Sequence, residues 1–499
     1  MKTNNLLKKP WSNCVGSDRV STMLRTEYWE RFRAVQAVMH FRYIRCHGLL
    51  GDELGVVRVD QWEGRRRVFY NFSYLDQIFD TMLAHQVRPF VEWGFMPSAL
   101  ASGDDTVFWW KGNITPPGDW DQWADLVTTL TRHWVDRYGL DEVRSWLFEV
   151  WNEPNLPQFW KNADQDAYFR LYETTVLAML TVDSELKVGG PAICGGSDHW
   201  IEAFLSFVQT RSLPLDFFTR HLYTAQPPRR VTPELFYQSL ANPESPGEEL
   251  REVRRRIDAA GYPGLPLHIT EFNTSYHPLC PVHDTPLNAA YLARLLSEAG
   301  DLVETLSYWT FSDLFEESDI PRAFFHGGFG LLARDGIPKP TFHLFAFFQK
   351  LGGSVHHRTD RCLTTWTPSG AALLAWNPVL ASREDDRVTV EESLPWAGGP
   401  ALVRRRRVHD GAANPWAVWN QLGRPRFPDR ETVDFLRLAA VPLVEVTKVE
   451  PVGGILNLRI VLEKNEITLV ELLPYRDESP DYWGLDDSFV DGYASQDRP

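Results

Sequence analysis

Short apolar segments and longer helix-like segments alternate along residues 12–312, and this alternation constrains the fold more than any other feature. The apolar segments are 12–15, 43–47, 88–94, 146–151, 187–190, 217–223, 267–271 and 306–310. The helix-like segments between them are 26–38, 75–84, 120–138, 165–181, 199–209, 246–260 and 287–299. Eight strands, each followed by a helix or loop, predict an α/β fold of the (β/α)8 TIM barrel type. A doubly wound open sheet is the alternative, but no GxGxxG motif follows the first strand.

Polar and aromatic side chains gather at the carboxyl ends of these strands. They are His47, Glu92, Trp93, Asn152, Glu153, His221, Tyr223, Glu271 and Trp309. Six of the eight strand ends carry them. In barrel enzymes the carboxyl-terminal rim holds the active site. Core packing does not explain six polar strand ends on one face, so this rim is the predicted site.

Two of these residues, Glu153 and Glu271, each end an apolar run, in FEVWNEPN and HITEFN. A retaining glycosidase needs such a pair, in which one carboxylic acid protonates the leaving oxygen and one carboxylate attacks the sugar carbon. Asn152 can donate a hydrogen bond to the sugar 2-hydroxyl, which matters most in the transition state. Pro154 predicts an extended backbone at Glu153.

Beyond residue 330 the pattern changes. Residues 342–350 predict an aromatic helix, and short alternating runs at 363–366, 372–376, 387–390, 402–409, 456–462 and 467–473 predict an antiparallel β-sandwich. We therefore predict a barrel at 12–325, a connecting segment and helix at 326–350, a β-sandwich at 351–475 and an extended tail at 476–499.

Composition excludes several classes of function. The net charge of −15 argues against a nucleic-acid partner, and the basic runs 65–67 and 404–407 are interpreted as solvated faces or turns.

The five Cys residues show no CxxC pair, which argues against a zinc site or a disulfide framework and favours a reducing compartment. The amino-terminal residues lack the apolar region of a signal peptide, and no apolar stretch is long enough to span a bilayer. We expect a cytoplasmic protein with no membrane partner. The 20 Trp, 16 Tyr and 29 Phe residues suit sugar binding.

The chain resembles the β-xylosidases of glycoside hydrolase family 39. The segments that carry the resemblance include FRYIRCHGLLGDELG, FEVWNEPNLPQFW, TRHLY, HITEFNTSY, SYWTFSDLFEE, FHGGFGLL, IPKPTFHLFAFF and, in the second domain, NPWAVWNQLGRPRFP and YWGLDD. The resemblance runs nearly end to end. It implies a barrel, a β-sandwich and a small β element that includes residues 1–11. It also implies a homotetramer, as in some members of the family.

The resemblance further implies a role for individual residues. Glu153 matches the acid/base, Glu271 the nucleophile and Asn152 the partner of the 2-hydroxyl. The positions that match the pocket for the nonreducing sugar are His47, His221, Tyr223, Trp309 and Glu317, with Phe108, Phe159 and Tyr276 as wall residues. Phe272 departs from the Tyr expected after the nucleophile, which removes a hydroxyl that could bond within the site. Catalysis of this type needs no metal or cofactor.

The expected function is exo-acting hydrolysis of terminal xylose from xylooligosaccharides, by double displacement through a covalent xylosyl-enzyme intermediate. The alternatives are an α-L-iduronidase-like or other β-glycosidase, and a non-catalytic sugar-binding protein. A negative charge on Glu317 would oppose a uronic acid. The roles of some residues stay open. His221 and Tyr223 could form a core pair, His47 could bond a loop carbonyl, and Trp309 could fill the barrel top. Of the adjacent Glu316 and Glu317, only one is expected to face the pocket.

Overall fold

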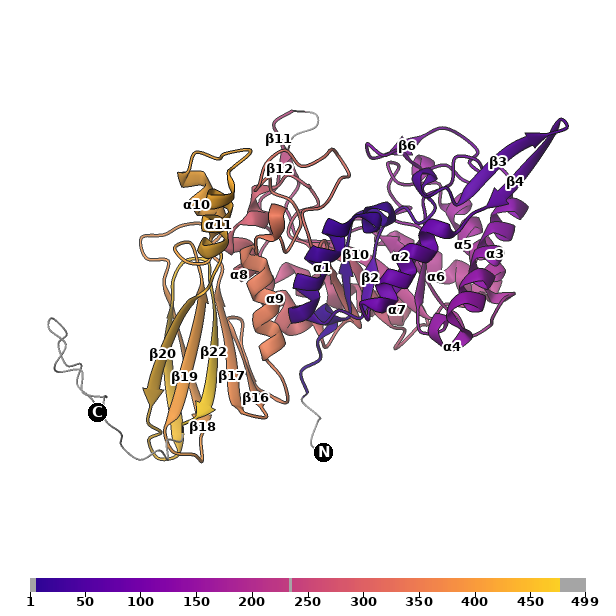
Figure 1. Ribbon diagram of the computed structural model, residues 1–499. Coiled ribbons are helices and arrows are strands. Elements are labelled where there is room, and N and C mark those ends of the chain that lie inside the picture. The colour runs from indigo at the N-terminus through magenta and orange to yellow at the C-terminus, as the bar shows by residue number, and fades with distance from the viewer. Residues whose placement is uncertain (1–5, 233–235, 476–499) are drawn as a thin grey trace.

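The computed structural model describes residues 6–232 and 236–475 (Figure 1). The predicted tail at 476–499 and the first five residues of the amino-terminal segment lie outside the described residues. No helix in the described ranges is both long enough and apolar enough to cross a bilayer.

The first part of the chain is a closed barrel of parallel strands, in the order β1-β14-β13-β10-β9-β8-β5-β2. These strands are β1 (Cys14–Gly16), β2 (Tyr43–Arg45), β5 (Arg88–Trp93), β8 (Leu147–Val150), β9 (Lys187–Ile193), β10 (Phe217–Tyr223), β13 (Leu267–Asn273) and β14 (Thr305–Tyr308). The predicted barrel is confirmed and the open sheet is excluded, because β1 pairs with both β14 and β2. Most strand residues are buried, since side chains fill the interior and helices cover the outside.

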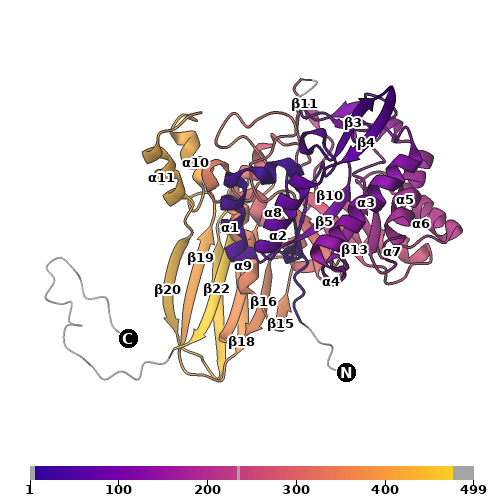
Figure 2. The ribbon, with the colours of Figure 1, turned by 45° about the vertical axis from the view of Figure 1, so that its right-hand side comes forward.

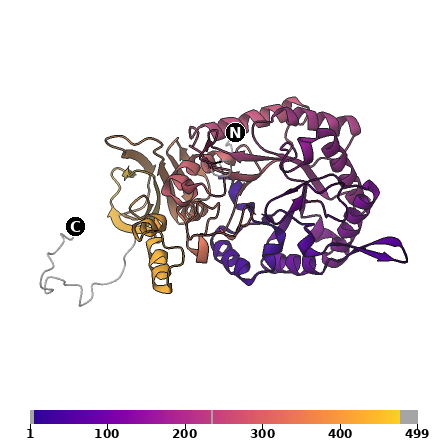
Figure 3. The same ribbon diagram turned by 90° about the horizontal axis from the view of Figure 1, so that it is seen from above.

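Helices form a ring around the barrel, as the view from above shows (Figure 3). The helices of the described chain are α1 (Thr26–Met39), α2 (Ser73–Ala84), α3 (Trp120–Tyr138), α4 (Leu140–Val143), α5 (Gln165–Leu180), α6 (His199–Arg211), α7 (Ser245–Ala259), α8 (Pro286–Ala299), α9 (Pro340–Lys350), α10 (Pro415–Gln421) and α11 (Arg430–Ala439). Several of these helices begin at a residue that favours a helix start. The Asp119 carboxylate accepts from the backbone of Asp121 and Gln122 at the start of α3, and Pro340 opens α9.

The second part is a β-sandwich that packs against α8 through β17 and β22 (Figures 1 and 2). One sheet contains β15 (Val355–Arg358), β16 (Cys362–Thr367), β17 (Gly370–Asn377), β22 (Glu466–Pro474), β19 (Ala401–Val408) and β20 (Leu443–Val449). The facing pair is β18 (Val388–Pro395) and β21 (Ile455–Leu462). Leu394 and Leu458 from the pair meet Leu373 and Leu472 from the larger sheet in one core. Leu6 forms a bridge with Ser354 beside β15. The predicted domain boundaries stay predictions.

Several short hairpins escaped the sequence interpretation. They are β3 (Val57–Trp62) with β4 (Arg65–Tyr70), β6 (Thr106–Val107) with β7 (Gly112–Asn113), and β11 (Arg229–Arg230) with β12 (Phe236–Tyr237). The hairpin of β3 and β4 projects from the barrel (Figure 1). It carries the basic run 65–67, which is exposed as expected.

The interpretation of the basic run 404–407 as a solvated face holds for the exposed Arg404 but not for Arg405 and Arg407, which lie on the same strand β19 and are paired. Nε of Arg407 lies 2.9 Å from Oε1 of the buried Glu466, and Nη2 of Arg405 lies 3.0 Å from the same oxygen. A buried carboxylate on the neighbouring strand β22 needs such partners, which explains the local positive charge.

Gly189 provides a test of how tightly β9 and β10 pack. A Cβ atom at Gly189 would lie 2.5 Å from the carbonyl oxygen of Phe217, closer than real contacts allow. Gly189→Ala is therefore expected to destabilise the protein by about 1–3 kcal/mol through overpacking, measured as a fall in melting temperature by calorimetry. Gly352→Ala is the matched control, because no atom lies within 4 Å of that Cβ. Equal melting temperatures for the two variants would contradict the packing argument.

Candidate active site

The two glutamates meet over the carboxyl-terminal mouth of the barrel. Glu271 lies within β13, and Glu153 follows β8 by three residues. One carboxylate oxygen of each, together with a ring nitrogen of His221, lies within 4.8 Å of the others. Both side chains are buried, with 7% of Glu153 and 4% of Glu271 exposed. The site is thus a pair of carboxyl groups with oxygens within 4.8 Å of each other, largely withdrawn from water.

The backbone at Glu153 differs from the predicted extended conformation. Glu153 has a φ of 41° and Trp151 a φ of 71°, both in the left-handed region. Pro154 disfavours the right-handed helical region, and contacts with other segments select the left-handed one. The Glu153 N–H donates to the Ala192 carbonyl at 3.0 Å, and the Trp151 indole N–H donates to the Phe159 carbonyl at 2.8 Å. Left-handed residues other than glycine concentrate at functional sites, where surrounding contacts offset their cost.

Arg45, at the end of β2, is the central cation of the site and was not singled out from the sequence. Its Nε lies 2.5 Å from Oε2 of Glu149, and its Nη1 lies 2.8 Å from Oε1 of Glu271. Its Nη2 contacts Oε2 of Glu92 and Oδ1 of Asn152, each at 2.9 Å. Burial opposes the charge on Arg45, but attraction by Glu149, Glu92 and Glu271 outweighs it and raises the pKa of Arg45 well above its ordinary value.

Glu149 completes this buried network from the middle of β8. Thr270 donates to its Oε1 at 2.9 Å, and Arg45 occupies its Oε2. The sequence signal for both was a charged residue inside an otherwise apolar barrel strand, because such a charge must find a buried partner.

Glu271 is held by two donors. Arg45 bonds its Oε1, and the hydroxyl of Tyr223 donates to its Oε2 at 2.7 Å. Donors on both oxygens stabilise the ionised carboxylate, the form that a nucleophile needs. Tyr223 is therefore not engaged in a core pair with His221.

Glu153 has the opposite electrostatic environment. Burial first, and then the charges of Glu271 and Glu92, raise its pKa well above the ordinary carboxyl range. Nδ1 of His221 lies 2.7 Å from its Oε1. Burial, with Arg45 and His47, lowers the pKa of His221 well below its ordinary value, so the imidazole is neutral. The environments thus favour the protonated form of Glu153 beside a Glu271 whose two oxygens accept hydrogen bonds, which is the arrangement that acid catalysis requires.

His47 bonds a carboxylate and not a loop carbonyl. Its Nδ1 lies 2.8 Å from Oε2 of Glu92, while its Nε2 faces Oε1 of Glu271 at 3.5 Å and Oε1 of Glu317 at 3.7 Å. The neighbouring Glu316 is instead paired with Arg19, at 3.0 Å, and with Arg25. Glu317 is therefore the member of the adjacent pair that faces the site.

Glu317 lies among other carboxyl groups, and this environment favours its protonated form. Burial first, and then the charges of Glu271, Asp18, Glu153 and Glu92, raise its pKa well above the ordinary carboxyl range. A protonated Glu317 can both donate and accept a hydrogen bond. The expectation that its charge would repel a uronic acid stays a prediction.

Aromatic rings border the carboxyl groups. The ring of Trp309 lies 4.7 Å from that of His47, the ring of Phe108 stacks on His47 at 5.9 Å, and Phe159 lies 5.6 Å from Phe108. Gly16 leaves room for Trp309, since a Cβ there would collide with the indole. Tyr276 lies further out, with 47% of its surface exposed and its ring 6.2 Å from that of Tyr223. The structure brings the predicted pocket residues together, with Tyr276 at the rim.

Two other predicted features resolve in different ways. The Oδ1 atom of Asn152 accepts from Arg45, which orients the amide and leaves its NH2 group to donate.

Phe272 points away from the carboxylates and packs against Tyr308 and Phe345, with ring centroids 5.5 and 6.4 Å away. Adjacent residues on a strand face opposite sides, so a hydroxyl at position 272 would not reach the site. The expectation that Phe272 removes a hydroxyl from the site is wrong.

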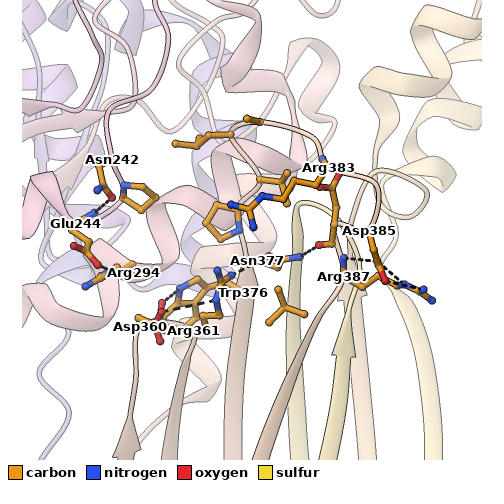
Figure 4. A pocket seen from close by; sticks show the side chains of 17 residues that line it. Asn242, Glu244, Arg294, Asp360, Arg361, Trp376, Asn377, Arg383, Asp385 and Arg387 are labelled. Carbon is orange, nitrogen blue, oxygen red and sulfur yellow. Dashed lines mark hydrogen bonds and ion pairs between the residues drawn. The ribbon is translucent and has the colours of Figure 1, made fainter.

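A separate pocket lies between the barrel and the sandwich (Figure 4). It is lined by charged side chains from both parts, including Glu244, Arg294, Asp385 and Arg387. These charges pair with each other, as in Arg294 with Glu244 at 2.9 Å and Arg387 with Asp385 at 3.0 Å. The charges of this pocket are engaged in ion pairs, whereas Glu153 and Glu271 face each other in the barrel mouth.

Comparisons with known proteins find relatives over nearly the whole chain. The family model described as "Glycosyl hydrolases family 39" matches residues 1–457. The chain is 50% identical to a β-xylosidase of Geobacillus stearothermophilus over 98% of this chain and 97% of that protein. It is 36% identical to a β-xylosidase of Caldicellulosiruptor saccharolyticus, over 94% of each chain. A crystal structure described as a monomeric β-xylosidase from Caulobacter crescentus superposes with a TM-score of 0.85 at 32% identity, covering 95% of this chain and 98% of that one.

Arg45→Met tests whether one cation neutralises the buried carboxylates. Without the guanidinium, Glu149, Glu92 and Glu271 lose their common partner, and we expect a loss of about 3–5 kcal/mol in the free energy of unfolding near pH 8. The variant's uncompensated carboxyls have raised folded-state pKa values, so their stability contribution is present at low pH and lost as pH rises. The loss should therefore shrink towards pH 5 in urea denaturation.

Arg42→Met is the matched control, because Arg42 is exposed and its guanidinium only lies over the Tyr43 ring at 5.8 Å. It should cost less than about 1 kcal/mol at either pH. An Arg45→Met loss that is equally small, or that does not change with pH, would contradict the network.

Proposed function

The chain belongs to glycosyl hydrolases family 39, and from this premise we propose that it is an exo-acting β-D-xylosidase that cleaves terminal xylose from xylooligosaccharides with retention of configuration. The observation that carries the proposal is the separation of Glu153 and Glu271, which have carboxyl oxygens within 4.8 Å of each other. Retaining enzymes hold their two carboxyl groups about 5–5.5 Å apart, whereas inverting enzymes need roughly 6.5–9.5 Å to admit a water. The relatives named above as β-xylosidases support the choice of sugar.

The proposed reaction begins with Glu271. Its carboxylate attacks the anomeric carbon while the Glu153 carboxyl gives its proton to the glycosidic oxygen, so the carbon–oxygen bond to the leaving group breaks and an ester to Glu271 forms. The ester carries no charge. The repulsion that Glu271 exerts on Glu153 is then removed, which favours the ionised form of Glu153.

The second step uses this change. Glu153, now a carboxylate, takes a proton from a water molecule whose oxygen attacks the anomeric carbon. The ester bond breaks, xylose leaves, and both glutamates return to their starting states. Tyr223 and Arg45 stay bonded to the departing carboxylate, so the same donors that stabilise the nucleophile also stabilise it as a leaving group.

The surrounding residues are proposed to bind the terminal sugar. The NH2 group of Asn152 donates to the 2-hydroxyl, and His47 and the protonated Glu317 bond other hydroxyls. Trp309 and Phe108 provide apolar faces for the sugar ring. Phe159 and Tyr276 form the outer wall of the sugar pocket. His221 holds the carboxyl group of Glu153 in position.

The site supports a neutral sugar over an iduronide. A uronic acid needs a cation for its carboxylate. Arg45 is the buried cation beside the glutamates, and it already contacts Glu149, Glu92 and Glu271. Both facing carboxyl groups also oppose a non-catalytic sugar-binding role, since Glu153 and Glu271 have the contrasting environments that catalysis uses.

We also propose that the chain associates with itself as a homotetramer. Exposed apolar side chains support association: Phe435 and Leu438 on α11, and Val444 and Val446 on β20, are each more than half exposed. The β-xylosidase structure from Caulobacter crescentus is described as monomeric, so measurement of the molecular mass of this chain in solution tests the proposal. A cytoplasmic location stays a prediction from the sequence.

Substitution of each glutamate tests the division of roles. With an aryl β-D-xyloside that has an activated leaving group, Glu153→Ala should keep the first step and slow the second, and added azide should restore turnover and give β-xylosyl azide. With unactivated xylobiose the same variant should lose about 10²–10⁴-fold in kcat/KM. Glu271→Gln should lose at least about 10³-fold with both substrates and form no β-azide. Glu30→Gln, on the exposed face of α1, is the control and should match the parent protein. Rescue of Glu271→Gln by azide to the β-product would contradict the assignment.

The pH profile of kcat/KM tests the protonation state of Glu153. The acid must hold its proton, so activity is present below the pKa of Glu153 and is lost as pH rises through it. Because burial and Glu271 raise this pKa well above the ordinary carboxyl range, the basic limb should lie correspondingly high. With an activated aryl xyloside, Glu153→Gln should abolish the basic limb. A basic limb that is unchanged in Glu153→Gln would assign it to another group.

A further inference from the structure

A carboxylate stands at a core-facing position of the sandwich, far along the chain from the catalytic glutamates. On β18 the inward residues are Val390, Glu392 and Leu394, with exposed residues between them. Glu392 is only 5% exposed, although its neighbours on the same face are apolar. A charge in such a place needs a partner of opposite charge or a metal ion. Glu392 belongs to the facing pair β18–β21, and its partners come from the other sheet.

A β-bulge brings two histidines to this carboxylate. Val355 pairs with Thr365 and His357 pairs with the next residue, Thr364, so His356 is the extra residue of β15. Adjacent residues of a regular strand point to opposite faces, but a bulge re-aims one of them. Nδ1 of His357 lies 2.9 Å from Oε2 of Glu392, and Nε2 of His356 lies 3.8 Å from Oε1. Each of the two imidazoles thus lies near a different oxygen of the Glu392 carboxylate.

A thiol completes the cluster. Cys362 opens β16, beside β15 in the same sheet, and its side chain is a free, buried thiol. One donor atom each from His357, Cys362 and Glu392 lies within 4.8 Å of the others. Figure 2 shows β15 and β16 next to each other at one edge of the larger sheet. Nitrogen, sulfur and carboxylate oxygen are the donors of tetrahedral zinc sites.

We infer that His356, His357, Cys362 and Glu392 bind a divalent transition-metal ion of the zinc class, which joins β15 and β16 of one sheet to β18 of the other. Zinc bonds of about 2.0–2.3 Å place the donors of a tetrahedron roughly 3.3–3.8 Å apart. The contact between His356 and Glu392 has this length already, and the His357 contact widens while Cys362 approaches. The thiol gives up its proton on binding, and the ion replaces the hydrogen bond between His357 and Glu392.

The ligands come from β15 and β16 of one sheet and from β18 of the other, so the ion would link the two sheets. Binding to the folded chain stabilises it in proportion to the logarithm of the ion concentration. The nearest alternative is that a protonated His357 and Glu392 form an ion pair and take no metal. The two accounts differ in whether Cys362 matters.

The test uses the full chain after treatment with a chelator and dialysis. Zn²⁺ titration by calorimetry should give one site per chain, and melting temperature should rise with added Zn²⁺. Co²⁺, as a spectroscopic substitute, should give a thiolate-to-metal charge-transfer band in the near ultraviolet. Cys362→Ser should abolish the band, and it and Glu392→Gln should each weaken Zn²⁺ binding by at least about 10-fold. Cys280→Ser, another buried free cysteine, is the matched control and should bind as the parent does.

A further variant keeps the test decisive if Cys362→Ser or Glu392→Gln fails to fold. The side chain of His357 is 51% exposed, so the fold should tolerate the substitution His357→Ala. This variant should still bind Zn²⁺ more weakly than the parent chain does. No Zn²⁺ binding by the parent chain overturns the inference. Binding that persists in Cys362→Ser and His357→Ala but is lost in Glu271→Gln also overturns it, by assigning the ion to Glu153, His221 and Glu271. None of these readouts depends on hydrolytic activity.

Discussion

The catalytic end of the barrel depends on one buried guanidinium. Arg45 reaches Glu149 in the barrel interior, Glu92 beneath His47, Glu271 at the mouth and the amide of Asn152. Four groups from three other strands or strand ends thus take their positions from a residue of β2. Isolated buried carboxylates are costly, whereas a guanidinium with donors in a fixed fork can compensate several at once. The barrel can therefore hold an ionised Glu271 in a place that water barely reaches.

The contrast between the two glutamates follows from what this cation does not contact. Glu271 has donors on both oxygens, from Arg45 and Tyr223, whereas Glu153 bonds the neutral His221 and lies beside Glu271. One carboxyl is thus stabilised as an anion and the other as an acid, although both are glutamates in the same cavity. Formation of the covalent ester would remove the charge that keeps Glu153 protonated, so the first step prepares the base of the second.

Local pattern was enough to predict the barrel, because each strand is a short apolar run and each helix a longer stretch, and β10 and α3 have the predicted bounds. The glutamate pair was visible because each ends such a run. Arg45 and Glu149 were missed because they lie inside apolar runs, and only the closed barrel brings them together. The left-handed backbone of Glu153 depends on Ala192, the outward direction of Phe272 on strand register, and the meeting of Glu392 with the histidines on a bulge and on a second sheet. These are non-local contacts that neither motif nor spacing contains.

Retention of configuration is the claim on which the assignment of Glu271 as a nucleophile and Glu153 as an acid rests. The most direct measurement is proton NMR of the first xylose released from an aryl β-D-xyloside, recorded before the product mutarotates. The proposed double displacement predicts β-xylose as the first product, with the α-anomer growing in afterwards. α-Xylose as the first product would show a single displacement by water and would contradict the covalent mechanism.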